Sequence, residues 1–239
     1  MKTIITIDLS EESERVVELK TTLRHVSIPD KEFIENFAKL IREIHRRHEL
    51  VIVTGGGKTA RRYIELARDF GASEVFCDLI GIDATRLSAR LLSAAIGKDA
   101  NLEPPKDHID GLKALNFGKI VVMGGTHPGH STDAVAALFA EYIHADLFIN
   151  ATDVDGIYDR DPQKYKDAKR YEKLSVEQLV DMVKSQSLGA GKYELIDILA
   201  AKVIQRSKLK TIFLNGRNIE NMKNAIEGKK FIGTVIENG

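Results

Sequence analysis

The sequence predicts an α/β fold, a three-layer sandwich whose central sheet is mostly parallel. Apolar runs that do not alternate with polar residues, at residues 50–54 and 146–151, are typical of strands buried on both faces of a parallel sheet. Segments with a helical spacing of apolar residues separate such runs, so strands and helices alternate along the chain. Two of the strands lead directly into glycine-rich turns that open helices, at residues 55–58 and 124–133.

Composition narrows the class of protein. The chain has 239 residues, 43% of them hydrophobic and 29% charged, so it can bury a substantial core in one large α/β domain or in two small lobes. We predict a single domain over residues 1–239. Its 35 basic and 35 acidic residues cancel, which argues against nucleic acid or an acidic membrane surface as a partner. Cys77 is the one cysteine, so no intrachain disulfide forms, and no apolar run approaches the roughly 20 residues of a membrane span. With no secretory signal at the N-terminus, these features predict a cytoplasmic protein.

The N-terminal region holds two candidate strands. Residues 2–9 are rich in β-branched side chains and residues 14–20 alternate, so the two runs could pair as a hairpin across the polar break at residues 10–13. Pro29 and Asp30 then open a helix, with Asp30 as its N-cap. Apolar residues at helical spacing follow this cap.

A glycine-rich turn follows the strand at residues 50–54 and opens a helix at residues 59–70. Three consecutive glycines, Gly55 to Gly57, let a ligand approach the backbone closely. Basic side chains flank them, namely Lys58, Arg61 and Arg62. The spacing does not match a Walker A motif, and a tight turn without a ligand is the simpler alternative. The coincidence of glycine and positive charge favours a ligand-binding turn.

The second glycine-rich turn follows an apolar run at residues 120–123 and precedes an apolar helix at residues 134–143. A glycine pair breaks the strand, and Thr132 or Asp133 is expected to cap the helix. Backbone N–H groups and the positive end of the helix dipole then point at one place, which suits a phosphate. An ordinary strand-to-helix connection is the alternative, and the presence of the earlier glycine turn favours the phosphate site.

The rest of the chain continues the alternation. Further helices are predicted at residues 76–96, 107–115, 175–184, 194–207 and 219–226, and further strands at residues 210–215 and 233–236. Ser175 and Gln178 form a capping box, and residues 187–192 form a glycine loop. The acidic residues of a polar loop, residues 152–162, either form turns or serve a metal-bound phosphate. Because ligands bind at the carboxyl ends of parallel strands, this loop and both glycine turns are expected at one edge of the sheet.

Five motifs occur in a characteristic order. They are the glycine turn at residues 55–61, Asp78 with Gly81 and Ile82, the turn at residues 123–133, the loop at residues 150–162, and Ala200-Ala201-Lys202. In this order they resemble the archaeal type of uridylate (UMP) kinase, within the amino acid kinase family, from Pro29 to the C-terminus. The resemblance implies an amino acid kinase-like fold with an acceptor half at about residues 1–145 and a nucleotide-donor half at about residues 146–239.

The resemblance also implies roles for single residues in a transfer of the ATP γ-phosphate to UMP. UMP would be bound, with its ribose at Asp78 and its phosphate in the second turn, by Gly56, Asp78, Thr126, His127, Pro128, Gly129, His130, Ser131 and Thr132. The ATP phosphates would contact Gly57 and Arg61, and the adenosine would contact Thr152, Tyr158 and Asp161. Lys202 would stabilise the transferring phosphoryl group, and Asp133 would orient the lysines. Proteins of this kind use Mg²⁺ with ATP, serve pyrimidine biosynthesis and are typically hexamers.

The N-terminal segment, residues 1–28, departs from this family, whose first strand ends in a Gly-Gly-Ser loop around the transferring phosphate. No glycine precedes Gly55 in this chain. One alignment places residues 9–11 at the loop, and another places residues 20–22 there, after a first strand at residues 15–20. A smaller departure is Ile198, where the family commonly has proline.

The altered loop leaves two functions open. The first is a UMP kinase weakened by the loss of backbone donors around the transferring phosphate. The second is a nucleotide- or oxyanion-binding protein of the same fold without efficient transfer.

Overall fold

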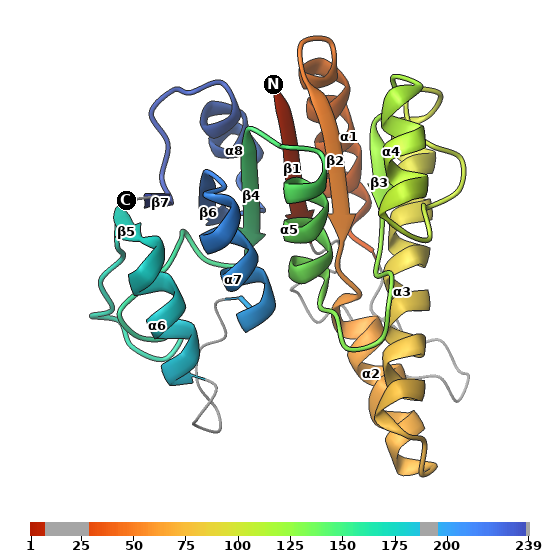
Figure 1. Ribbon diagram of the computed structural model, residues 1–239, viewed down its shortest axis with the longest axis horizontal. Helices are drawn as coiled ribbons and strands as arrows, with labels where there is room; N and C mark the ends of the chain where they lie inside the picture. Colours follow the sequence, from red (N-terminus) through yellow and green to blue (C-terminus); the bar gives the residue numbers. More distant parts are fainter. Residues whose placement is uncertain (8–28, 187–195, 238–239) are drawn as a thin grey trace.

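A seven-stranded sheet forms the centre of the molecule, with helices on both of its faces (Figure 1). The computed structural model of the protein describes residues 1–7, 29–186 and 196–237. The strand order is β3-β2-β1-β4-β6-β7-β5, and all neighbouring strands are parallel except β6 and β7. The predicted α/β class with a mostly parallel sheet is therefore confirmed.

The elements follow the predicted alternation with one addition, the short strand β5. The strands are β1 (Lys2–Ile7), β2 (Glu49–Thr54), β3 (Val121–Met123), β4 (Leu147–Thr152), β5 (Lys173–Ser175), β6 (Thr211–Asn215) and β7 (Thr234–Glu237). The helices are α1 (Lys31–His45), α2 (Gly57–Asp69), α3 (Glu74–Ile96), α4 (His108–Asn116), α5 (Thr132–Tyr142), α6 (Val176–Gln186), α7 (Ile198–Ser207) and α8 (Ile219–Ile226). Among the described residues, no helix is both long and apolar enough to cross a membrane.

Two apolar cores lie on opposite faces of the sheet. In β2, Val51 and Val53 point into the core shared with α5, α6 and α7, whereas Leu50 and Ile52 point into the core shared with α1, α3 and α8. This follows from the period of two in a strand, which sends successive side chains to opposite faces. Because every residue of such a strand is buried, the strand reads as a continuous apolar run. The result is the predicted three-layer sandwich.

Strand β1 lies in the middle of the sheet, which corrects the predicted hairpin. Its two edges are taken by β2 and β4, both parallel to it, so residues 14–20 cannot pair with it. The second run of the predicted hairpin lies outside the described residues. Among the described residues, β1 provides the strand between β2 and β4. The position of the loop after the first strand stays a prediction, because both alignments place it in residues that lie outside the described ranges.

Helix starts were predicted from capping residues, with mixed success. Asp30 caps α1 by accepting a hydrogen bond from Phe33 N at 3.0 Å, and Ser175 and Gln178 form the predicted capping box before α6. The cap of α5 is Ser131, not Thr132 or Asp133. The last long helix, α7, begins at Ile198 and not at residue 194, because Asp197 is in extended conformation and caps it.

Ile198→Pro is expected to stabilise the protein. Ile198 is the first residue of α7, its side chain is 42% exposed, and the side-chain cap bonds start at Leu199. Asp197 has φ −73° and ψ 157°, the conformation that a residue before proline prefers. Proline removes conformational freedom from the unfolded chain, so thermal unfolding should shift upward by about 1–4 °C.

The matched control is Ile219→Pro at the first residue of α8. The amide of Ile219 donates to the Arg217 carbonyl at 3.2 Å, and its side chain packs against the core, so this variant loses both contacts. A lower unfolding temperature for Ile198→Pro than for the parent chain would contradict the assignment of this helix start.

Candidate functional site

The candidate site lies at the carboxyl edge of the parallel strands. The chain first places β2 and then β3 on one side of β1, and it then places β4 on the other side of β1. Adjacent loops therefore diverge between β1 and β4, and ligands of open α/β sheets bind outside the carboxyl ends of the strands at such a point. Both glycine turns leave strands at this edge, and α2 with the adjoining end of α3 projects beyond it (Figure 1).

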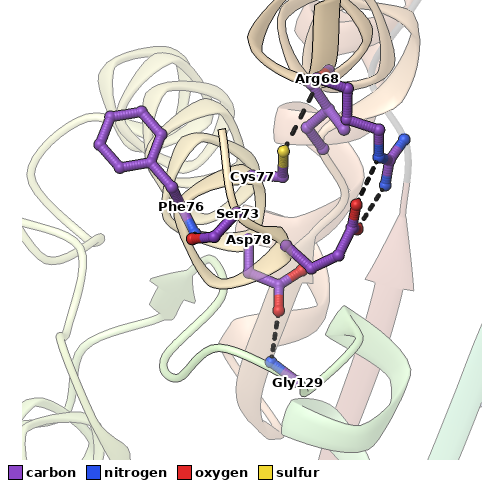
Figure 2. A network of polar contacts seen from close by, with 8 residues as sticks. Arg68, Ser73, Phe76, Cys77, Asp78 and Gly129 are labelled. Carbon is purple, nitrogen blue, oxygen red and sulfur yellow. Dashed lines mark hydrogen bonds and ion pairs between the residues drawn. The ribbon is translucent and has the colours of Figure 1, made fainter. Parts of the chain in front are cut away.

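Helix α3 holds the second turn, residues 124–131, at three points. The Thr85 hydroxyl accepts from Gly125 N at 2.7 Å, and Arg86 Nε donates to Gly125 O at 3.1 Å. Further along, Asp78 Oδ2 accepts from Gly129 N at 2.8 Å, as Figure 2 shows. Asp78 and the turn are thus brought together as the resemblance implied. Thr85 and Arg86 were not among the predicted site residues, because nothing in their helical spacing points to a turn some 40 residues later.

The first turn packs against the same helix. Gly56 lies close to both α2 and α3, because an added Cβ would stand 2.4 Å from Ala60 Cβ in α2 and 3.4 Å from Thr85 Cγ2 in α3. Gly57 has φ +55°, a backbone conformation that favours glycine, and begins α2 two residues before the predicted start. The Thr54 hydroxyl donates to Thr85 O at 2.8 Å. Thr85 therefore connects the two glycine turns.

Buried polar atoms of the second turn are left without a partner in the described structure. The Thr126 hydroxyl and the Nδ1 atom of His130 are both buried and accept or donate no hydrogen bond among the described residues. Buried polar groups normally find a partner, so these two atoms mark a place where a ligand can supply one. His127, Pro128 and Gly129 are exposed at the tip of the turn.

A third histidine, His108, packs against α5, the helix that follows this turn. The ring of His108 stacks on Phe139 with 5.3 Å between ring centroids, and its Nε2 lies 3.1 Å from the Val135 carbonyl oxygen. That contact requires a proton on Nε2. Burial lowers the pKa of His108, and the nearby rings of His127 and His130 lower it further. His108 is therefore expected to be neutral at pH 7 and to act as a packing residue.

Asp133 lies in the first turn of α5, over the carboxyl ends of β1 and β4. Burial and the nearby carboxylate of Asp197 raise its pKa to about 6, and interactions with Asn150 and Thr6 act in the opposite direction. The Thr6 hydroxyl and the Asn150 amide nitrogen are buried and have no good hydrogen bond elsewhere among the described residues. Asp133 is half-buried as a residue, and its carboxyl group is buried at the point where the strand order diverges.

Asp197 is a site residue that the sequence did not reveal. Its Oδ1 accepts from Leu199 N at 2.8 Å and from Ala200 N at 3.0 Å, and its Oδ2 accepts from the Ser131 hydroxyl. An acidic residue before an apolar helix is a recognisable capping signal, but its second bond joins residues 66 positions apart and follows from the tertiary structure alone.

Lys202 lies on the exposed side of α7. Its Nζ donates to Gln205 Oε1 at 3.1 Å, within the same helix. No contact between Lys202 and Asp133 occurs in the described structure, so the two residues with predicted catalytic roles are not joined by a direct bond.

The residues predicted for adenosine lie on the other side of the edge, after β4. The Thr152 hydroxyl donates to Val154 O at 2.8 Å, and Tyr158 forms a bridge with Arg170. Asp161 accepts from Gln163 N at 2.9 Å and pairs with Lys164. Asp161 thus forms a local turn, and its predicted contact with adenosine stays a prediction. Arg61, predicted for the ATP phosphates, is exposed on α2.

Two cavities lie away from this edge. One, of about 620 Å³, is at the amino ends of the strands and is lined in part by Arg47, His48 and Lys210. The other, of about 770 Å³, lies between α1 and α3. Neither contains any residue of the two glycine turns, so neither is the predicted site.

Comparison with known proteins agrees with the geometry. A model of the amino acid kinase family matches residues 25–215. The uridylate kinase of Methanocaldococcus jannaschii is 50% identical over 207 residues, which cover 86% of this chain and 91% of that protein. The uridylate kinase of Archaeoglobus fulgidus is 49% identical over 207 residues, covering 87% of this chain and 93% of that protein.

Solved structures share the fold. The crystal structure of the Archaeoglobus fulgidus uridylate kinase matches with a TM-score of 0.83 and 44% identity, covering 99% of this chain and 100% of that one. The UMP kinase of Ureaplasma parvum has a TM-score of 0.77 at 22% identity, covering 99% of this chain and 98% of that one, which shows a common fold.

The sheet order, the paired glycine turns and the long sequence match all point the same way. The family match spans both turns and extends to the last residue of β6. From this we conclude that the chain belongs to the amino acid kinase family.

Proposed function

We propose that the protein is a UMP kinase, which transfers the γ-phosphate of ATP to UMP and gives UDP and ADP. The observation that carries this proposal is the second glycine turn at the head of α5, held by Asp78, Thr85 and Arg86, with a buried Thr126 hydroxyl that has no hydrogen-bond partner in the described part of the chain. A phosphate monoester fits such a turn, because it accepts hydrogen bonds from backbone N–H groups and from the hydroxyl. The relatives named uridylate kinase support UMP as the monoester.

The mechanism needs no general base. The attacking atom is a phosphate oxygen of UMP, which is already anionic at neutral pH. It forms a bond to the γ-phosphorus while the bond from that phosphorus to the bridging oxygen of ADP breaks, and ADP leaves as an anion. Positive charge around the transferring group lowers the barrier, and we assign this charge to Lys202, to Arg61 and to the helix N-termini at the edge. Asp133 holds the cationic groups in place.

Mg²⁺ would arrive with ATP. Within the described residues, no group of three or more His, Cys, Asp or Glu side chains could hold a metal ion by itself. We assign the binding of this ion mainly to nucleotide phosphates and water, as is usual for Mg²⁺. When bound, the ion neutralises charge on the phosphates. The chain supplies the cations and backbone donors around it.

The assembly and the cellular setting follow from the same proposal. A homo-oligomer, a hexamer by family resemblance, would explain the large apolar side chains exposed along α3, namely Val75, Phe76, Leu79, Leu87 and Leu91. A cytoplasmic location and a role in pyrimidine biosynthesis fit a UMP kinase. We propose no nucleic acid and no membrane as a partner.

The alternative, a binding protein without efficient transfer, rests on the missing glycines before Gly55. The relatives are named as kinases at 44–50% identity over most of the chain, which favours the enzyme. The two functions differ in one measurement, the release of ADP that depends on UMP.

The test combines turnover and binding. ADP release should occur with UMP present and fall to background without it, and calorimetry should detect UMP binding in the absence of ATP. CMP serves as the control acceptor, and it should bind more weakly than UMP. No UMP binding, or a preference for CMP, would overturn the acceptor assignment, whereas UMP binding without ADP release would select the binding protein.

Rebuilding the N-terminal loop should raise activity. Residues 10 and 11 lie nearer in sequence to β1, which is described as far as Ile7, than residues 21 and 22 do, and we expect replacement of Ser10 and Glu11 by glycine to raise kcat at least about tenfold by restoring backbone donors. Replacement of Thr21 and Thr22 by glycine is the matched control and should leave kcat unchanged. A gain in the second variant alone would place the loop at residues 20–22.

A further inference from the structure

Helices α5 and α7 run side by side with their N-termini together. Ser131, the cap of α5, donates its hydroxyl proton to Asp197, the cap of α7, and at the other end Arg206 Nε donates to Glu141 Oε1 at 2.9 Å. The Ser131 oxygen also accepts from Ala134 N at 3.0 Å. A single carboxylate thus caps α7 directly and α5 through Ser131.

The bond between the two caps brings the N-termini of α5 and α7, which are the positive ends of their helix dipoles, close together. Parallel helix dipoles repel each other, and each N-terminus is stabilised by a negative charge. Asp197 supplies that charge for both helices, from a position next to Asp133 in the first turn of α5. The bond also joins α5, which precedes β4 in the chain, to α7, which follows β4. It therefore spans the boundary between β1 and β4, where the strand order changes direction.

We propose that Asp197 is a positioning residue of the phosphoryl transfer, which holds the first turns of α5 and α7 together and keeps a second negative charge beside Asp133. The inference rests on the proposed function, in which Asp133 orients the cationic groups. Asp197 acts through Asp133 and through the spacing of the two helices, without contact with the substrates.

The charges around Asp133 support an effect of Asp197 on its protonation. From the sheet it faces Thr6 and Asn150, which are uncharged. On α7, Lys202 donates to Gln205, and Arg206 pairs with Glu141 at the far end of the helices. On α4, His108 bonds to Val135 and has a pKa lowered by burial, so it is neutral at pH 7. Burial raises the pKa of Asp133 most, and among the described residues the carboxylate of Asp197 raises it further.

The test is Asp197→Asn, which keeps a good N-cap on α7 and removes the charge. The pKa of Asp133 is measured by ¹³C NMR of labelled aspartate carboxyls, with Asp133→Asn used to assign the signal. It should fall from about 6 toward its ordinary value, and the acid limb of the kcat profile should move to lower pH by the same amount. An unchanged pKa of Asp133 would overturn the proposal.

Two further variants separate charge from structure. Ser131→Ala breaks the bond between the helix caps and leaves the charge of Asp197 in place, so the pKa of Asp133 should stay near 6 while kcat falls. If the pKa of Asp133 falls as far in Ser131→Ala as in Asp197→Asn, movement of the helices and not the charge of Asp197 is responsible, and the charge effect is refuted. Asp107→Asn, at the cap of α4, is the matched control and should change neither the pKa of Asp133 nor kcat. Because the NMR titration does not depend on turnover, it tests the effect of Asp197 on the pKa of Asp133 even if the chain proves not to be a kinase.

Discussion

Replacing Lys202 by alanine is expected to lower kcat about 100- to 1,000-fold, with UMP affinity nearly unchanged. The Lys202 ammonium is exposed on α7 and bonded only weakly, to Gln205 at 3.1 Å, so its removal should leave the fold intact. A charge that acts mainly on the transition state lowers kcat more than it lowers ground-state binding. Steady-state kinetics with ATP and UMP, together with calorimetry of UMP, measure the two effects separately.

Two controls accompany this variant. Lys210→Ala removes another exposed lysine, at the amino edge of the sheet, and should behave like the parent chain. Lys202→Arg keeps the charge on a planar group of different shape and should recover part of the lost rate. Normal turnover in Lys202→Ala would show that Lys202 is an ordinary surface lysine and would remove it from the mechanism.

Asp133→Asn is expected to abolish transfer and at the same time to stabilise the fold. The pKa of Asp133 rises from 3.8 in the unfolded chain to about 6 in the folded protein. Between these values the folded state holds a proton that the unfolded state has released, so stability falls as pH rises through this window. Above pH 6 the carboxylate is buried in charged form, at a cost of roughly 1–3 kcal/mol, which asparagine avoids.

Thermal unfolding at two pH values checks this expectation. At pH 7.5 the variant should unfold about 2–10 °C above the parent chain, and the difference should shrink as pH approaches 4. Asp107→Asn is a control of opposite sign, because hydrogen bonding from Asp110 N lowers the pKa of Asp107, so that variant should lose stability at neutral pH. A variant at Asp133 that is less stable than the parent at pH 7.5 would show that the carboxylate is a stabilising group.

Much of the fold could be predicted, because its signals are local. The apolar run of β2 and the cap at Asp30 depend on side chains a few residues apart, and both occur as predicted. Helix α8 was predicted residue for residue. The approach of Asp78 to the second turn was also anticipated, but through family resemblance and not through spacing.

Other features depend on which segments meet, and these the sequence did not reveal. The predicted hairpin is wrong because β2 and β4 occupy both edges of β1, a fact about pairing and not about strand propensity. The start of α7 was placed too early, because the apolar pattern does not show that Asp197 turns its carboxylate toward Ser131.

The sequence by itself determined the alternation of strands and helices, the two glycine turns and the family to which the chain belongs. These properties follow from the periodicity of apolar residues, from capping residues and from the order of the motifs. They can be recognised without knowing which residues are in contact. Only the tertiary structure decided that Thr85 connects both turns and that Asp197 lies beside Asp133. The reason is physical: hydrogen bonds and charge interactions depend on distances of a few ångströms, which folding sets between residues far apart in the chain.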